Sequence, residues 1–401
     1  MSNRKLISGN KAVAEGVRLS EVNVVSAYPI TPQTSIVEYI SEYVANGILH
    51  AQFVQAESEF GAMSVCIGAS SVGARVFTAT CSQGLALMHE LNYVAAGLRL
   101  PIVMAVTNRQ LSQPFGMWCD HSDAMGERDS GWLQIYVESC QEALDTVIQA
   151  FKIAENKEVL LPIMVCLDGF VLSHTSEVVD VPELQTVKEF LPPYKPDPSY
   201  HTLIDVNAPM AAGGGCPPAY TMEFDYKKFE AQEKAKEVIK KVDEEFASLF
   251  GRRYGLVEAY RCEDAEIILA AMGTMVSTAK EVVDRLREDK GWPVGVLKIR
   301  SYRPFPKNEV LKAASKAKVL AVVNRAISYG IGTPLFSDIA ASMCNASQKP
   351  ILLNFVAGMG GRDVTPKNIM TIFEKAKKTT ETGVVESEIE WIGLNRALLG
   401  D

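Results

Sequence analysis

The feature that most constrains this chain is the alternation of short apolar runs with segments of helical periodicity. Runs such as residues 22–28 (VNVVSAY), 74–80 (ARVFTAT) and 101–107 (PIVMAVT) each precede a stretch whose apolar residues recur at helical spacing. This alternation predicts a parallel sheet, because consecutive parallel strands need a crossover connection that is usually a helix. The sequence therefore predicts an α/β fold.

The same alternation resumes after an irregular stretch and predicts a second α/β unit. Residues 181–253 begin as a proline-rich linker and continue into a charged helix near residues 226–250, whose apolar residues fall near helical spacing. Beyond them lie further apolar runs that alternate with helical patterns, at residues 266–273, 294–301, 319–324 and 351–358. We expect two doubly wound parallel-sheet domains, at residues 1–180 and 254–401, with residues 181–253 as linker and connector helix.

Composition and charge limit the classes of function. The chain has 401 residues, 47% of them hydrophobic, and a formal net charge of −8, which disfavours a nucleic-acid partner. Its apolar runs are shorter than the roughly 18 residues of a membrane span, and its N-terminus lacks the pattern of a secretory signal, so we expect a cytoplasmic protein. The eight cysteines include no C-x-x-C pair, which predicts reduced thiols and no iron-sulfur cluster on this chain.

Four polar loops follow predicted strands of the first domain, at the edge where a parallel sheet binds its ligands. They contain YPITP (28–32), ESEFGA (57–62), CSQGL (81–85) and TNRQLSQP (107–114). Each loop alone is compatible with an ordinary strand-to-helix turn, in which Pro32 suits a helix start. The four together favour a ligand site.

Glu59 and Arg109 are the strongest single candidates in these loops. Glu59 precedes an almost uncharged run of small and apolar residues, so its carboxylate is expected at a buried junction, where desolvation favours the protonated form. Glu57 is its rival, since either residue could be exposed and simply stabilised by a helix N-terminus. Arg109 should emerge at a strand end, where it could bind a carboxylate or form an interface salt bridge.

Other chemistries find less support in the sequence. Residues 115–132 (FGMWCDHSDAMGERDSGW) combine a histidine with several acidic residues, but their spacing matches no metal-ligand template that we know, and we predict no metal on this chain. The sequence contains no phosphate loop, no dinucleotide-binding glycine turn and no nucleophile elbow.

Read in order, the motifs resemble the alpha subunit of the pyruvate:ferredoxin oxidoreductases (pyruvate synthases), within the 2-oxoacid:ferredoxin oxidoreductase superfamily. They span nearly the whole chain and are YPITP, ESEFGA, TCSQGL, TNRQLS, WCDHSDAMGERDSGWLQIYVES, RSYRPFP, VVNRAISYG and GMGGRDVTP. The resemblance implies that the first domain is the pyrimidine-binding half of a thiamine diphosphate site. It also implies a second domain like the transketolase C-terminal domain, in which Arg303, Arg325 and Arg362 make contacts between domains or subunits.

The resemblance also assigns roles to individual residues. Glu59 matches the glutamate that hydrogen-bonds the aminopyrimidine ring and favours the tautomer that removes the thiazolium proton. Thr31 is expected to hydrogen-bond the substrate, and Arg109 to grip its carboxylate. Further contacts are implied for the cofactor from Tyr28, Pro29, Ser82 and Gln83, and for the substrate from Asn108.

Partner subunits are implied because the sequence has no G-D-G motif, which holds diphosphate and metal in such enzymes. A beta subunit would supply the diphosphate half-site and Mg²⁺. The [4Fe-4S] clusters would lie on partner subunits, with gamma and ferredoxin-like delta subunits as companions. The implied reaction is the oxidative decarboxylation of pyruvate with coenzyme A to acetyl-CoA and CO₂, or its reverse, with ferredoxin as electron carrier.

Two alternatives remain open at this point. The loop at residues 110–118, with its bulky Phe115, differs from the wording typical of pyruvate enzymes, so the same chemistry on a branched-chain, aryl or oxalate substrate is possible. A non-catalytic assembly subunit that kept the fold is the second alternative. The motif positions of Glu59, Thr31 and Arg109 disfavour it.

Overall fold

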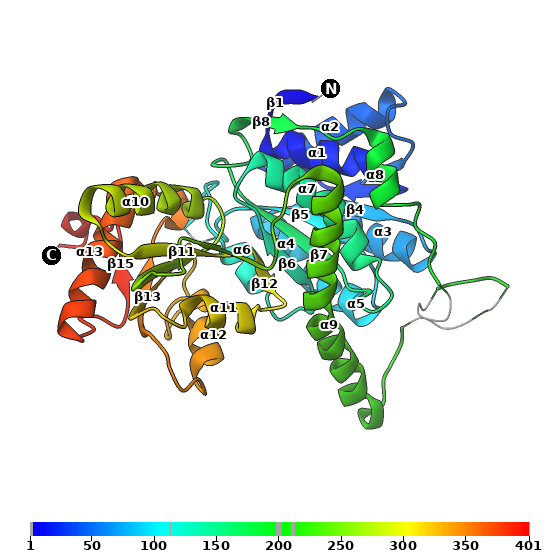
Figure 1. Ribbon diagram of the computed structural model, residues 1–401. Helices are drawn as coiled ribbons and strands as arrows, with labels where there is room; N and C mark the ends of the chain where they lie inside the picture. The colour runs from blue at the N-terminus through cyan, green and yellow to red at the C-terminus, as the bar shows by residue number, and fades with distance from the viewer. Residues whose placement is uncertain (1–2, 113, 198–202, 208, 210–212, 401) are drawn as a thin grey trace.

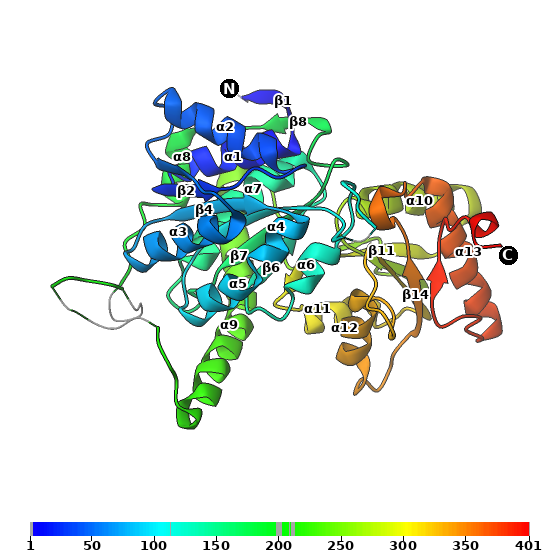
Figure 2. The ribbon, with the colours of Figure 1, turned by 180° about the vertical axis from the view of Figure 1, so that it is seen from behind.

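The computed structural model describes residues 3–112, 114–197, 203–207, 209 and 213–400, which fold around two large β-sheets lying side by side (Figure 1). Helices cover both faces of each sheet, and the view from behind shows the same two units (Figure 2). The predicted pair of doubly wound α/β sheets is therefore confirmed. In the described part of the chain, no helix is both long enough and apolar enough to span a membrane.

Strands from the N-terminal half of the chain form most of the first sheet, which is parallel except at one edge. Its central strands are buried along their whole length, as expected where helices cover both faces. The strands follow one another across the sheet as β12 (Ser301–Arg303), β6 (Leu133–Tyr136), β7 (Ile163–Asp168), β5 (Val103–Asn108), β4 (Val76–Thr80), β2 (Val24–Ala27) and β3 (Gln52–Gln55).

The helices of this unit pack into two cores, one on each side of the sheet. One core contains α1 (Gly9–Leu19), α2 (Thr34–Ala45), α7 (Cys140–Ala154), α8 (Leu184–Phe190) and α9 (Pro218–Phe250), and the other contains α3 (Glu59–Ser71), α4 (Ser82–Leu87), α5 (His89–Gly97) and α6 (Ser122–Gly126). Residues 84–97, predicted as one helix, are divided between α4 and α5 at Met88. An antiparallel ribbon of β1 (Arg4–Ser8) and β8 (Ser176–Asp180) was not predicted.

The predicted connector helix is longer than expected and lies partly in the first core. Helix α9 begins at Pro218 rather than near residue 226. Its C-terminal half buries Ala235, Ile239 and Phe246 in the same core as α1 and α7. Its first turns project from the body of the molecule (Figure 1) and expose side chains such as Tyr220.

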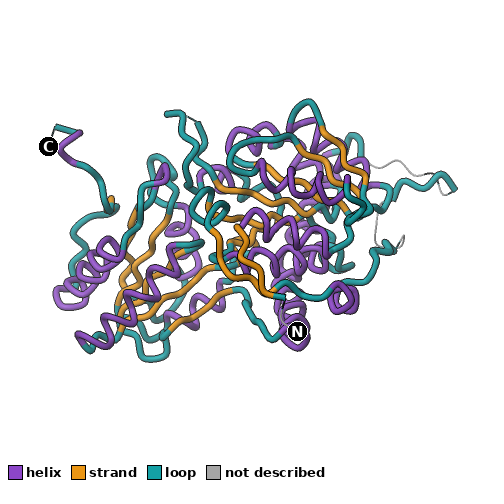
Figure 3. The backbone as a smooth tube through the Cα atoms, turned by 90° about the horizontal axis from the view of Figure 1, so that it is seen from above, coloured by secondary structure: helices purple, strands orange, loops and turns teal. Residues whose placement is uncertain are grey.

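The second sheet has the same parallel construction, with an antiparallel edge strand. Its strands are β15 (Glu390–Trp391), β14 (Ile351–Val356), β13 (Val319–Asn324), β10 (Ile267–Ala271), β11 (Val294–Ile299) and β9 (Val257–Tyr260). One face packs on α10 (Met275–Lys290) and α13 (Pro366–Thr382), and the other on α11 (Lys307–Ala314) and α12 (Pro334–Met343). Seen from above, the two sheets are neighbours within one continuous body (Figure 3).

Strand β12 joins the two units, although it comes from the second half of the chain. It pairs antiparallel with β6 of the first sheet, and the Tyr136 N–H donates to the Arg300 carbonyl over 2.8 Å. The fully buried Arg300 side chain then reaches α7, where its Nε lies 2.9 Å from an oxygen of Glu142. The second half of the chain thus completes the first sheet.

Candidate active site

The candidate site lies at the carboxyl ends of β2, β4 and β5 in the first sheet. The YPITP loop follows β2, the CSQ turn follows β4, and Asn108 and Arg109 close β5. Glu59 begins α3, and these strands are neighbours in the sheet. The fold therefore gathers loops that are separated by up to 80 residues of sequence at one edge.

Glu59 is held at the first position of α3, where its carboxylate is buried. Ser58 caps the helix by accepting a hydrogen bond from the Gly61 N–H at 3.2 Å, which fixes the start of α3. Glu59 is only 6% exposed, whereas its rival Glu57 is exposed. Among the described residues, no group donates a hydrogen bond to the Glu59 carboxylate. The carboxylate of this largely buried residue is therefore free to bond to a ligand.

Gly84, in α4, packs directly against this carboxylate. A Cβ atom at position 84 would lie 2.5 Å from Glu59 Oε1 and 2.5 Å from the Thr80 hydroxyl oxygen, which is closer than real Cβ atoms approach. The Thr80 hydroxyl is itself buried and has no hydrogen-bond partner among the described residues. Only a residue without a side chain lets α4 approach these two polar groups so closely.

Arg109 is buried and connects two loops of the site. Its Nε donates to the Gly116 carbonyl at 2.9 Å, and its Nη1 donates to the Thr31 carbonyl at 2.8 Å. The Phe115 ring lies over the guanidinium, with 5.2 Å between ring centroid and Cζ. A guanidinium carries five N–H donors. Because these two carbonyls do not use all of them, the Arg109 side chain can still donate to a ligand carboxylate.

The remaining predicted contacts divide into exposed and internally bonded residues. Tyr28, Pro29 and Thr31 are exposed in the YPITP loop, and the Thr31 peptide with Pro32 is cis. Ser82 is buried and donates from its hydroxyl to the Gln110 carbonyl at 2.6 Å. Gln83, beside it, is half-buried.

Asp123, which we did not single out in the sequence, organises the buried part of the site. One carboxylate oxygen accepts from the backbone N–H groups of Ser82 and Arg109, both at 2.9 Å. The other oxygen accepts from the Asn108 side-chain amide at 2.9 Å, so Asn108 faces Asp123. Burial raises the pKa of Asp123 to about 6, although these N–H donors oppose the shift. Asp123 positions the residues that follow β4 and β5.

A second buried polar cluster lies between the two units. Asp168 ends β7 and accepts hydrogen bonds from His121 Nε2 at 2.8 Å and from the Thr274 N–H at 3.0 Å. The Arg325 guanidinium lies 3.7 Å from the same carboxylate. Burial acts to raise the pKa of Asp168, but Arg325 and His121 lower it well below its usual range.

This cluster brings Cys119, His121 and Asp168 close enough together to hold a metal ion, with ligand atoms within 4.8 Å of one another. However, both Asp168 oxygens already accept hydrogen bonds, and Arg325 places a positive charge beside them. An added cation would meet that charge, so the arrangement favours an ion-paired contact between the units.

Comparison with known proteins identifies the family to which the chain belongs. Residues 15–244 match the family described as pyruvate flavodoxin/ferredoxin oxidoreductase, thiamine diphosphate-binding, and residues 265–369 match pyruvate:ferredoxin oxidoreductase core domain II. Pyruvate synthase subunit PorA of Methanothermobacter thermautotrophicus is 49% identical over 97% of this chain and 98% of its own length. The chain belongs to the pyruvate:ferredoxin oxidoreductase family.

Proteins named for other 2-oxoacids are also similar to this chain. The ketoisovalerate oxidoreductase subunit VorA of Pyrococcus horikoshii is 46% identical over 98% of this chain and 98% of its own length. The solved 2-oxoglutarate:ferredoxin oxidoreductase of Magnetococcus marinus superposes with a TM-score of 0.72 at 20% identity, covering 94% of this chain and 66% of that chain. At that identity the superposition establishes the fold alone. The resemblance predicted from the motifs is confirmed.

Thiamine diphosphate, which the description of the matched family names, would need polar partners for its ring and positive charge for its diphosphate. The Glu59 carboxylate, which accepts no hydrogen bond from any described residue, could bond to the polar edge of the cofactor's ring. The four loops of the site contain one basic residue, Arg109, and its guanidinium is bonded to two backbone carbonyls. A diphosphate group would therefore need charges from elsewhere.

Arg303, Arg325 and Arg362 differ in what they contact. Arg303 donates to the Arg128 carbonyl at 3.1 Å, and Arg325 reaches Asp168, so both cross between the two units as predicted. Arg362 is exposed and instead bonds to the Gly393 carbonyl within its own unit.

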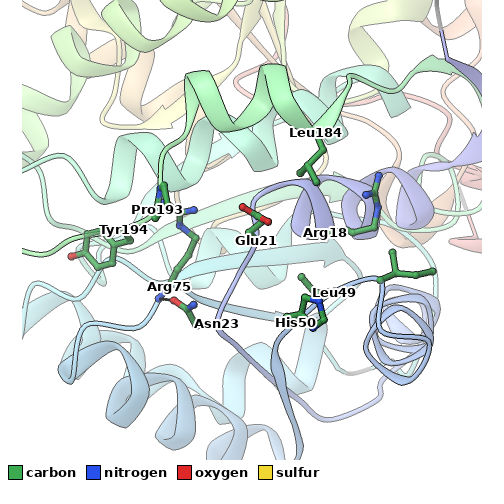
Figure 4. A pocket seen from close by; sticks show the side chains of 10 residues that line it. Arg18, Glu21, Asn23, Leu49, His50, Arg75, Leu184, Pro193 and Tyr194 are labelled. Atoms are coloured by element: carbon green, nitrogen blue, oxygen red, sulfur yellow. Dashed lines mark hydrogen bonds between the residues drawn. The ribbon is translucent and has the colours of Figure 1, made fainter.

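A cavity of about 260 Å³ lies at the opposite, amino-terminal edge of the first sheet (Figure 4). Its charged side chains are already paired within the protein: Arg18 lies 2.7 Å from Glu15, and Arg75 lies 2.6 Å from Glu155. Figure 4 shows Arg75 beside Asn23, whose side-chain oxygen accepts from the Arg75 N–H at 2.8 Å. These groups need no ligand to balance them.

Proposed function

We propose that this chain is the alpha subunit of a cytoplasmic 2-oxoacid:ferredoxin oxidoreductase complex that acts on pyruvate. The reaction joins pyruvate and coenzyme A, releases CO₂ and one proton, and passes two electrons singly to ferredoxin, giving acetyl-CoA. It can run in either direction, because oxidation and reductive carboxylation use one site. The chain would supply the pyrimidine-binding half of the thiamine diphosphate site.

The observation that carries this proposal is the carboxylate of Glu59, a residue only 6% exposed, which accepts no hydrogen bond from any described residue. Thiamine diphosphate, when bound, supplies a carbon nucleophile and an electron sink. Glu59 would hold a proton between its Oε1 and a ring nitrogen of the cofactor. Tyr28, Pro29, Ser82 and Gln83 would line the same cofactor, Ser82 chiefly through backbone that Asp123 fixes.

Substrate binding is assigned to the loops after β2 and β5. The Arg109 fork would bind the substrate carboxylate, and the exposed Thr31 side chain would hydrogen-bond the reacting end of the molecule. Asn108 would act through Asp123 and the Arg109 backbone rather than on the substrate directly. This arrangement suits any small 2-oxoacid.

A second candidate function is the same reaction on a larger 2-oxoacid. Phe115 is 66% exposed and stands over Arg109, where it would meet the substrate side chain. The 46% identity to a ketoisovalerate oxidoreductase subunit keeps a branched-chain 2-oxoacid as the alternative substrate. Because a pocket distinguishes one methylene by only about 1–3 kcal/mol, one residue here can shift the preference.

Partner subunits complete the proposed enzyme. A beta subunit would bring the diphosphate half-site, Mg²⁺ and [4Fe-4S] clusters, with gamma and ferredoxin-like delta subunits as further members. The relatives named above as subunits support this view. The single basic residue of the site loops supports it too, since a diphosphate needs more positive charge.

The test is to purify the chain with its natural partners and measure coenzyme A-dependent viologen reduction. Pyruvate, 2-oxoisovalerate, phenylglyoxylate and oxalate are compared as substrates. We expect the highest kcat/KM for pyruvate and no turnover by the isolated chain. Activity of the isolated chain would rule out the shared site, and a complex inactive on every 2-oxoacid would leave the chain as an assembly subunit.

A further inference from the structure

A turn of the second unit reaches into the surroundings of the candidate site. The glycine turn, residues 358–361 (GMGG), follows β14, and three of its residues have left-handed backbone angles: Gly358 with φ +75°, Gly360 with φ +59° and Gly361 with φ +78°. Glycine adopts this conformation without steric cost, whereas other residues rarely do.

The glycine turn packs directly on the substrate loop, which we define as residues 110–120, with residue 113 outside the described part. The Gly361 N–H donates to the Cys119 carbonyl at 2.6 Å, and the Gly360 N–H donates to an Asp120 carboxylate oxygen at 3.3 Å. A Cβ on Gly361 would lie 2.2 Å from the Cβ of Trp118. The turn can approach the loop this closely only because position 361 has no side chain.

The substrate loop in turn holds Arg109. The Gln110 N–H donates to the Trp118 carbonyl at 3.0 Å, which closes the loop on itself. Inside this closure, the Gly116 carbonyl accepts from Arg109 Nε at 2.9 Å. A shift of Trp118 would therefore be transmitted to the atoms that orient the guanidinium.

We propose that the glycine turn of the second unit is a positioning element for substrate binding: through Trp118 and the substrate loop it fixes Arg109 and Phe115, and so sets both the affinity for the 2-oxoacid and the preference for its side chain. This inference rests on the proposed function of Arg109. It gives the second unit a role in specificity beyond holding the domains together.

The competing explanation is that the turn is only part of the contact between the two units. The variant Gly361→Ala distinguishes the two, because its added methyl group meets Trp118. Gly383→Ala is the matched control: Gly383 ends α13 with φ +70°, a similar left-handed conformation, and an added Cβ would meet nothing within 4 Å. Both variants carry the same backbone strain, but only one displaces the loop.

The experiment measures both variants in the assembled complex. Relative to Gly383→Ala, we expect Gly361→Ala to raise the KM for pyruvate on the order of 10-fold, to leave the KM for coenzyme A unchanged, and to change the pyruvate to 2-oxoisovalerate ratio of kcat/KM. Hydrogen exchange of residues 110–120, measured without substrate, should become faster. Equal KM values and equal exchange in the two variants would overturn the inference.

A milder variant covers the case in which Gly361→Ala does not assemble. In Gly360→Ala the added Cβ would lie 3.2 Å from the Gln110 side-chain oxygen, a contact that a small shift relieves. The same direction of change is expected, with a smaller KM effect. Faster loop exchange in a complex that oxidises no 2-oxoacid would refute the proposed function, whereas unchanged exchange in an active complex would refute the positioning role.

Discussion

The carboxyl ends of the strands in the first sheet carry Glu59, Thr31 and Arg109, while those in the second sheet carry Thr274, Arg325 and the glycine turn. The first set includes the Glu59 carboxylate, which accepts no hydrogen bond from any described residue. The second set is turned toward the first unit, where Thr274 and Arg325 meet Asp168. The same architecture thus presents its loop edge to a ligand in one case and to a neighbouring domain in the other.

This difference separates two kinds of buried charge. A carboxylate kept for a ligand is left unsatisfied, so its removal should change activity more than stability. A carboxylate paired across an interface is fully satisfied, so its removal should change stability more than activity. Substitutions on the two edges can test that separation.

Glu59→Gln should have the largest effect, on the edge that faces the ligand. We expect kcat to fall on the order of 10³-fold, about 4 kcal/mol, because a neutral amide cannot take or return the proton. Stability should change little, since no described residue donates to this carboxylate. Viologen reduction by the complex measures the effect, with the exposed Glu57→Gln as control. Turnover near normal would remove Glu59 from the chemistry.

Asp168→Asn probes the contact between the two units, which Asp168 makes from the end of β7 in the first sheet, and should act on stability. Loss of this carboxylate leaves Arg325 buried without its partner, so we expect the free energy of unfolding to fall by about 4 kcal/mol at pH 7. Because the folded pKa of Asp168 lies below its unfolded value, the unfolded state binds more protons and the contribution is lost as pH falls below about 4.

Urea unfolding at several pH values measures this prediction. The difference between the unsubstituted chain and Asp168→Asn should be constant above about pH 5 and shrink in more acidic solution. Arg362→Ala, at an exposed arginine of the second unit, is the control and should change stability by less than about 0.5 kcal/mol. An equally small effect of Asp168→Asn would mean that the cluster does not join the units.

The contribution of Asp123 to stability should change with pH in the opposite direction from that of Asp168. Its folded pKa of about 6 lies above its unfolded value, so the folded state binds more protons between about pH 4 and 6. The unsubstituted chain should therefore gain stability over Asp123→Asn as pH falls through that window, by at most about 3 kcal/mol. Paired unfolding curves at pH 4 and pH 7 measure the change, and a loss of stability on acidification would contradict the assignment.

Arg109→Lys should give the smallest of these effects, confined to one substrate. A lysine lacks the planar fork that bonds to the Gly116 and Thr31 carbonyls while keeping donors free. We expect the KM for pyruvate to rise about 10-fold, or 1.4 kcal/mol, with the KM for coenzyme A unchanged. Equal increases in both KM values would instead indicate a general disturbance of the site.

Much of the fold could be predicted because the strands of both sheets are apolar on both faces. Strands such as β5 and β13 read as uninterrupted apolar runs, and the helices between them keep helical spacing. Strand β12 could not be predicted, since three residues after a longer strand carry no periodicity of their own and pair with a strand far away in the sequence.

The site was predictable in its location more than in its internal contacts. Glu59 and Glu57 stand two residues apart, and only the start of α3 decides which one is buried. Asp123 is indistinguishable in sequence from Asp120 and Asp129, because the N–H groups that define it come from loops 14 and 41 residues away. Such contacts depend on how strands are placed in the sheet, which residue spacing does not encode.

Strand β12 has a consequence for how this polypeptide can be divided. A chain cut after α9 would lose the strand that pairs with β6 and the Arg300 side chain that balances Glu142, leaving an open sheet edge and a buried uncompensated charge. Expression of the N-terminal half alone should therefore give an aggregation-prone fragment. An N-terminal fragment that keeps this sheet edge paired must therefore extend through β12, to residue 303.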